Sequence, residues 1–94
     1  MDLYKEIEKT FPLLKKALSK EDLAIFKETT IGDLSIFHFG LGIWIRNNIL
    51  SSQDNTLISL FKENGIEQLD DMSSYMIRLF HYNICKYISK GGRA

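Results

Sequence analysis

The sequence predicts an all-α fold: a small single-domain bundle of about five to six helices around a central apolar helix at about residues 32–50. Three observations lead to this prediction: repeated helix-start signals, a single proline, and the absence of strand-like alternation of useful length. A chain of 94 residues fits one helical domain over 1–94. Its 45% hydrophobic and 26% charged residues differ from a disordered composition, so we expect it to fold by itself.

Asp2 and Pro12 are expected to mark the start and the end of the first helix. Asp2 can cap a helix with Leu3 and Ile7 on its apolar side, and Pro12 should stop or kink that helix because proline lacks an amide donor. Thr10 can cap its continuation over 13–18. We therefore expect two short helical pieces before residue 19.

Two hydroxyl residues, each followed three positions later by an aspartate, mark the next helix starts. They are Ser19 with Asp22 and Thr30 with Asp33, a variant of the capping box. The first pair opens a short helix around Phe26. The second pair opens the central helix at 32–50.

The segment 32–50 is the most apolar in the chain. On a helical wheel, one side carries Leu34, Phe37, Leu41, Trp44, Ile45 and Asn48, and another side carries Ile36, Phe39 and Ile43. A helix that is apolar on two sides is typical of a buried position, so we expect this helix to be the most buried one. Trp44 is then a core anchor.

Two further helices are predicted in the second half of the chain. One covers about 55–63 and ends at Asn64-Gly65, where glycine can adopt a left-handed conformation. The last begins after Asp70 or Asp71 and ends before Gly91, with acids near its start and bases toward its end, as the helix dipole favours. Residues 91–94 are expected to fray.

Charge and cysteine content exclude several classes of function. The formal net charge is zero, so no general field attracts nucleic acid or an anionic membrane. Cys85 is the single cysteine, which forbids an intrachain disulfide and fits a reducing compartment, so we expect a cytoplasmic protein. The start shows no secretion signal, and the longest uncharged apolar stretch, 34–45, is too short to span a bilayer.

A polar stripe runs along the central helix. It consists of Ser35, His38, Gly42 and Arg46, which fall within about 60° of one another on the wheel. Polar groups on a buried helix need partners, because an unpaired one costs about 1 to 3 kcal/mol. The expected partners of Arg46 are the acids at the start of the last helix.

Two interpretations of this stripe remain open. In the structural one, Arg46 docks onto Asp70 or Asp71, while Asn47 and Asn48 tie down the following loop. In the functional one, the stripe lines a cleft that binds a ligand or partner. Tyr75 and Tyr82 lie off the core face of the last helix, so we expect them to be exposed and include them among the candidate binding residues. The candidate binding residues are His38, Arg46, Asn47, Asp70, Asp71, Ser73, Tyr75 and Tyr82.

Two segments resemble a known family. They are HFGLGIWIRNN at 38–48, and Gly65-Ile66 followed by DDMSS at 70–74. Together they are similar to an uncharacterised bacterial family, domain of unknown function 6794, over about 13–82. The chain has Ile49-Leu50 where that family tends to have a tryptophan, and Leu69 where it often has a proline. The resemblance implies no activity, because the family has none established.

The sequence favours a binding domain over an enzyme. His38 is a possible base and Asp70 with Asp71 a possible acid pair, but no nucleophile elbow, phosphate loop or metal-ligand pair accompanies them, so no cofactor or metal is expected. The leading hypothesis is a non-enzymatic domain, from a bacterium or a mobile element, that binds another protein. An immunity, antitoxin or defence-related role would fit such a domain. The partner could also be a second copy of the chain, which would make the protein a homo-oligomer.

Two other classes of function are carried as alternatives. The first is a small-ligand-binding or catalytic domain centred on Arg46, His38 and Asp70/Asp71. The second, which the neutral charge disfavours, is nucleic-acid binding through the bases of the last helix. Those bases are Arg78, Lys86, Lys90 and Arg93.

Overall fold

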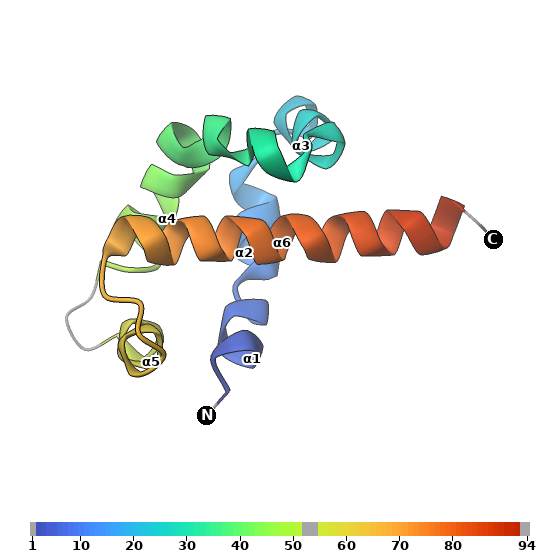
Figure 1. Ribbon diagram of the computed structural model, residues 1–94. Helices are drawn as coiled ribbons and strands as arrows, with labels where there is room; N and C mark the ends of the chain where they lie inside the picture. Colours follow the sequence, from blue (N-terminus) through green and yellow to red (C-terminus); the bar gives the residue numbers. More distant parts are fainter. Residues whose placement is uncertain (1, 52–54, 93–94) are drawn as a thin grey trace.

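The computed structural model describes residues 2–51 and 55–92, and in that part of the chain it contains helices and no strand (Figure 1). The predicted all-α fold is therefore confirmed. In chain order the elements are α1 (Leu3–Glu8), α2 (Phe11–Ala17), α3 (Lys20–Glu28), η1 (Ile31–Phe37), η2 (His38–Gly42), α4 (Ile43–Asn48), α5 (Thr56–Glu63) and α6 (Leu69–Gly92).

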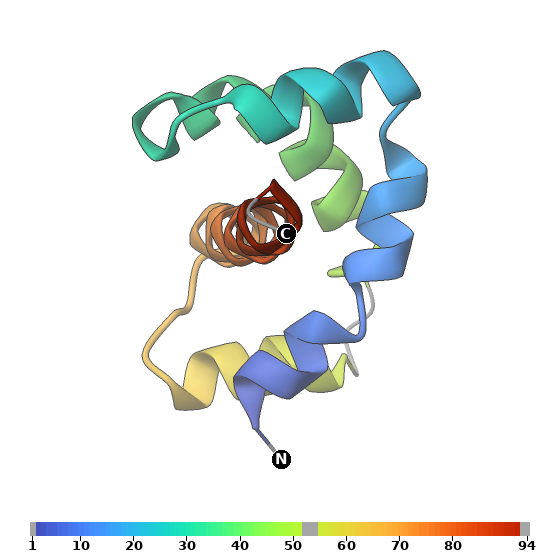
Figure 2. The same ribbon diagram turned by 90° about the vertical axis from the view of Figure 1, so that its right-hand side faces the viewer.

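The long helix α6 occupies the centre of the fold. Figure 2 shows α6 nearly end-on, with the other helices arranged around it. It contacts α3, η1, η2 and α4, while α1 packs against α5. In the described part of α6, the buried apolar side chains are Met72, Met76, Ile77 and Phe80. Their spacing forms one apolar stripe along the helix, which is the pattern expected of a helix packed against several neighbours.

The segment 31–48 is helical, as predicted, but it is neither one regular helix nor the central one. It winds as a 3₁₀ helix in η1, as a π-helix in η2 and as an α-helix in α4. Leu34, Leu41 and Ile45 face the core, whereas Ile36 and Phe39 are exposed. The expectation of a helix buried on two sides was wrong because only one of its apolar sides meets other helices.

Side-chain caps begin several helices. Asp2 accepts a hydrogen bond from the Tyr4 amide, and Ser19 accepts one from the Asp22 amide, both at 3.0 Å. These two predicted caps are confirmed. Thr10 and Thr30 also precede helices but make no cap bond to an amide. The Thr30 hydroxyl instead donates to the Asp33 carboxylate.

The boundaries of the last two helices agree closely with the sequence. Asn55 caps α5 by accepting from the amides of Leu57 and Ile58. Gly65 follows α5 with a φ of 84°, the left-handed conformation expected there. The final helix starts at Leu69 and continues through Gly92, beyond its predicted end. Residues 93 and 94 lie outside the described part, so the frayed tail stays a prediction.

An aromatic cluster joins α2, α3, η1 and α6. The ring of Phe26, fully buried, stacks on Phe80 at 5.3 Å and meets Phe37 edge-on at 4.8 Å. The ring of Phe11 also lies against that of Phe80, with centroids 5.5 Å apart. Trp44 is half-buried and packs against the core, as expected of an anchor. Such aromatic pairs each contribute about 0.5 to 1.5 kcal/mol beyond their burial.

Within the described residues, no helix is both long and apolar enough to cross a membrane. This agrees with the short apolar stretch seen in the sequence.

Candidate functional site

The polar stripe of the 31–48 segment meets the beginning of α6 at two places. At the first, Nη1 of Arg46 donates a hydrogen bond to Oγ of Ser73 at 3.1 Å and lies 3.3 Å from Oδ1 of Asp70. The Asp70 side chain is 71% exposed and that of Arg46 only 20%. The predicted pairing of Arg46 with the start of the last helix is therefore present, through Asp70.

Ser73 is the buried member of this contact. Its hydroxyl accepts from Arg46 and donates to the backbone carbonyl of Asp70 at 3.0 Å, and the residue is fully buried. A buried hydroxyl with both a donor and an acceptor partner is satisfied. Among the described residues, no buried side-chain nitrogen or oxygen lacks a partner.

Gly42 lies beside the guanidinium of Arg46. A Cβ at this position would lie 3.4 Å from Nη1 of Arg46 and 3.8 Å from Cδ1 of Ile77. These are ordinary van der Waals distances, so the 31–48 segment lies close to α6 at Gly42 but still leaves space for a methyl group. These contacts fit the structural interpretation of Arg46, in which it joins two helices.

The second meeting place contains a serine and a histidine. Oγ of Ser74 lies 3.1 Å from Nδ1 of His38. The two side chains line a cleft of about 370 Å³ between η1 and α6. The residues lining it are Ile31, Gly32, Leu34, Ser35, His38, Ser74, Ile77 and Arg78. His38 and Ser35 of the polar stripe therefore lie in an open cleft, while Arg46 does not line it.

The functional interpretation of the sequence overlooked Ser74 and Arg78 as members of one site. Ser74 belongs to the DDMSS segment, and Arg78 follows it by four positions, so both point to one side of α6. That spacing was visible in the sequence. Their position opposite His38 was not, because it depends on how α6 packs against η1 and η2.

The other sequence-predicted site residues are not brought together. Asp71 is exposed and forms no ion pair with Arg46, and Asn47 is exposed on α4. Tyr75 and Tyr82 are exposed on α6, as predicted, and the ring of Tyr75 packs edge-on against Phe61 at 5.8 Å. The structure thus divides the predicted set into the two contacts above and several separate surface residues.

The predicted role of the paired asparagines differs from the observed contacts. Nδ2 of Asn48 donates to the carbonyl of Trp44 at 2.9 Å, within its own helix. Among the described residues of the following loop, the side-chain amide of Asn55 donates to the carbonyl of Ile49. A capping residue beyond the loop, rather than Asn48, therefore makes this contact.

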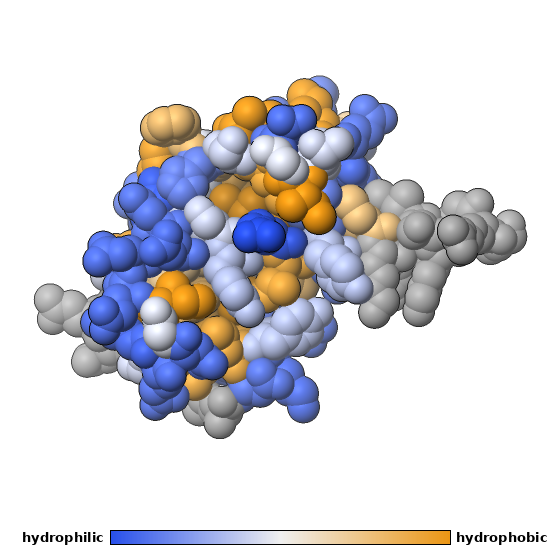
Figure 3. Space-filling model, viewed as in Figure 1, coloured by the Kyte–Doolittle hydropathy of each residue, from blue (hydrophilic) through white to orange (hydrophobic). Residues whose placement is uncertain are grey.

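Exposed apolar side chains form a further feature that the sequence interpretation placed in the core. We define the apolar face as Ile36, Phe39 and Ile43, which are 63%, 79% and 40% exposed. Figure 3 shows apolar atoms reaching the surface along the upper edge of the molecule, where Figure 1 places the helical segments after α3. This exposure could not be deduced from apolarity alone.

Residues that could carry metal or redox chemistry are sparse in the described part of the chain. Cys85 is a free, half-buried thiol whose Sγ lies 3.5 Å from Nε2 of His81. No three His, Cys, Asp or Glu side chains are grouped there as metal ligands would be. Of the predicted nucleic-acid-binding bases, Arg78 lines the cleft, Arg93 lies outside the described residues, and the side chains of Lys86 and Lys90 are also outside the description.

The fold is a small all-α domain. Its irregular helical segment 31–48 contacts the central helix α6 through Arg46–Ser73 and His38–Ser74. A family model matches residues 5–84 of this chain, and the chain belongs to that family, Domain of unknown function (DUF6794). No curated protein and no solved structure matches the chain. The family resemblance stated from the sequence is confirmed.

Proposed function

We propose that this domain is a non-enzymatic protein-interaction module that binds another protein through the apolar face. The observation that supports the proposal is the exposure of Ile36, Phe39 and Ile43 along one helical segment. Spacings of three and four residues place these side chains on successive turns of the segment. A partner could therefore contact all three at once.

The energetic argument rests on the size of these side chains. Complete burial of an isoleucine or phenylalanine side chain contributes about 1.5 to 3 kcal/mol. Apolar side chains grouped on a surface are typical of interaction sites, and a central aromatic residue often dominates such a site. Phe39, at 79% exposed, is the aromatic residue with most to gain on binding.

The segment that carries the apolar face is also held in place. Arg46 contacts Ser73, and His38 contacts Ser74, so two side-chain contacts attach this segment to α6. Leu34 and Leu41 are buried on its core side. A binding surface that is already ordered loses less conformational entropy when its partner arrives.

We place this interaction in the cytoplasm of a bacterium or a mobile element, as an immunity, antitoxin or defence-related domain. The bacterial setting is supported by the family resemblance, and the reducing compartment by the single free Cys85. The defence-related role is supported only by the small size of an interaction domain.

The test compares the binding of Phe39→Asp with that of a matched surface variant. Ile25→Asp is suitable, because Ile25 is 53% exposed on α3, outside the apolar face. Wild type and both variants are immobilised, a lysate of the source cells is passed over each, and captured proteins are quantified by mass spectrometry. We expect one partner to be captured by wild type and Ile25→Asp but lost with Phe39→Asp.

Thermal unfolding of both variants provides the folding control, and sedimentation velocity tests whether the partner is a second copy of the chain. A homo-oligomer dissociated by Phe39→Asp would identify self-association through the apolar face. Equal capture and equal sedimentation by wild type and Phe39→Asp would contradict the proposal.

A second function is supported by the cleft beside His38. We propose that it holds a small oxyanion, because Arg78, His38, Ser35 and Ser74 supply donors there and none of its described lining residues is acidic. This replaces the sequence-based centre on Arg46 and Asp70/Asp71. Arg46 and Asp70 contact Ser73 instead of lining the cleft.

Inorganic phosphate is the probe for this second function. Titration of isotope-labelled protein should shift the amide signals of Ser35, His38 and Ser74 saturably. Arg78→Gln should abolish the shifts, whereas Lys20→Gln, which removes one positive charge from the surface of α3, should retain them. Unsaturable shifts of the same size in all three proteins would eliminate the oxyanion site.

A further inference from the structure

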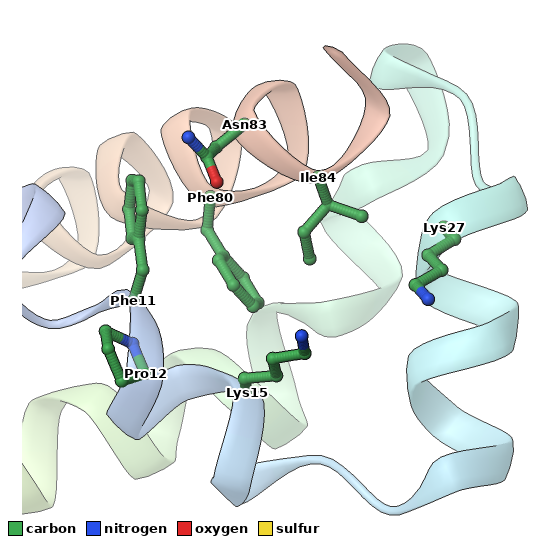
Figure 4. Close-up of a pocket in the computed structure, with 7 residues that line it drawn as sticks. All are labelled: Phe11, Pro12, Lys15, Lys27, Phe80, Asn83 and Ile84. Atoms are coloured by element: carbon green, nitrogen blue, oxygen red, sulfur yellow. The ribbon is translucent and has the colours of Figure 1, made fainter. Parts of the chain in front are cut away.

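A second, larger cavity lies away from both surfaces described above. It has a volume of about 570 Å³ and opens between α2, α3 and α6 (Figure 4). Its lining residues are Phe11, Pro12, Lys15, Lys27, Phe80, Asn83 and Ile84. Cavities of about 300 to 1,000 Å³ are typical of small-molecule sites.

One wall of this cavity is apolar. Phe11 and Phe80 are buried, their rings lie 5.5 Å apart, and Ile84 stands one turn of α6 beyond Phe80. Figure 4 shows the Phe80 and Ile84 side chains pointing from α6 into the space toward α2. An uncharged hydrocarbon group placed here would remain in contact with apolar atoms.

Two lysines stand at the other side of the same space. Lys15 comes from α2 and Lys27 from α3, and Figure 4 shows both side chains directed into the space between these helices and α6. Neither lysine forms an ion pair within the described part of the chain, and none of the described lining residues is acidic. The cavity thus combines an apolar wall with two positive charges that a ligand could neutralise.

We propose that this cavity binds an aliphatic monocarboxylate, with its carboxylate between Lys15 and Lys27 and its hydrocarbon chain against Phe11, Phe80 and Ile84. An inorganic anion would leave the apolar wall unused, and a neutral hydrocarbon would leave both lysine charges without a partner. Lys15 and Lys27 are both exposed, so an anionic group can reach them from the solvent side of the cavity. A lysine ammonium group forms charge-assisted hydrogen bonds with a carboxylate.

Decanoate, decanol and acetate are the probes, because they separate the contribution of the charge from that of the chain. Each is titrated into isotope-labelled protein below the concentration at which decanoate forms micelles. Decanoate should shift the amide signals of Phe11, Lys27 and Ile84 saturably. Decanol should bind more weakly at the same residues, and acetate should produce no saturable shift.

The double variant Lys15→Gln/Lys27→Gln tests the charges. It should weaken decanoate binding about fivefold and leave decanol binding unchanged, because two exposed ion pairs are lost. The matched control is Lys16→Gln/Lys20→Gln, which removes the same charge from α2 and α3 at exposed lysines outside the cavity lining. Its affinity for decanoate should equal that of wild type.

Vesicles of phosphatidylglycerol distinguish a free carboxylate from an anionic membrane surface. The protein should not sediment with them. Absence of saturable decanoate binding, equal weakening by both double variants, or sedimentation with vesicles in place of decanoate binding would overturn the proposal. The apolar face contains neither Lys15 nor Lys27. Failure of the carboxylate proposal would therefore leave the protein-interaction proposal unaffected, and failure of the protein-interaction proposal would leave the carboxylate proposal unaffected.

Discussion

The guanidinium of Arg46 donates to the hydroxyl of Ser73 across 3.1 Å, joining α4 to a fully buried residue on α6. Asp70, on the same guanidinium, is mostly exposed. The two interactions should therefore differ in strength. A charged hydrogen bond to a buried hydroxyl contributes more than an ion pair with a solvated carboxylate.

Arg46→Ala should lower the free energy of unfolding by about 1 to 3 kcal/mol, because Ser73 loses the donor to its buried hydroxyl. Asp70→Ala should lower it by less than about 1 kcal/mol, as expected for an exposed ion pair. Urea unfolding monitored by circular dichroism measures both values. If Asp70→Ala cost as much as Arg46→Ala, the buried contact would not be the dominant one.

Substitutions of Gly42 should raise or lower the free energy of unfolding depending on the size of the new side chain. Gly42→Ala should stabilise the protein by about 0.5 to 1 kcal/mol, because alanine is the better helix former and its Cβ fits at 3.4 Å from Arg46. Gly42→Leu should destabilise it by about 1 to 3 kcal/mol, because the larger side chain overlaps Arg46 and Ile77. Thermal unfolding of the two variants beside wild type checks the signs, and destabilisation by alanine would show that this position has no spare room.

Phe39→Ala and Phe26→Ala remove the same side chain from opposite environments. Phe39 is 79% exposed, so its loss should change the free energy of unfolding by less than about 0.5 kcal/mol. Phe26 is fully buried and its loss should cost about 3 to 5 kcal/mol. Denaturant midpoints at equal protein concentration give the comparison. A large cost for Phe39→Ala in the monomer would mean that the apolar face is covered by the chain itself.

Gly65→Ala should destabilise the protein by about 1 to 2 kcal/mol, because the φ of 84° is unfavourable for a residue with a Cβ. Gly32→Ala is the control, since a Cβ there meets nothing within 4 Å. Differential scanning calorimetry of both variants measures the effect. Equal melting temperatures for Gly65→Ala and wild type would contradict the left-handed conformation.

The sequence predicted best those features that depend on neighbouring residues. The caps at Asp2 and Ser19 and the glycine turn at Gly65 are local hydrogen-bonding or backbone preferences, and the structure contains all three. The contact between Arg46 and Asp70 was predictable because a charge on an apolar helix needs a partner, and the sequence placed two adjacent acids, Asp70 and Asp71, at the start of the last helix.

Long-range packing was harder to predict. Apolarity alone does not say which side of a helix meets another helix, so Ile36 and Phe39 were expected in the core and are exposed. The contact of His38 with Ser74 depends on the position of α6 beside η2, across a long stretch of chain. No local pattern encodes that position.

The π-helical turn η2 contains Phe39 and directly precedes α4, which carries Arg46. A π-helix has more residues per turn than an α-helix, so η2 contains surplus chain relative to a regular helix. Deleting one residue within His38–Gly42 would remove this surplus and favour regular α-helical winding through the segment. Phe39 lies within this turn and Arg46 follows it in α4, so a change in the length of the turn would alter the direction of Phe39 relative to Arg46 even though neither side chain had been substituted.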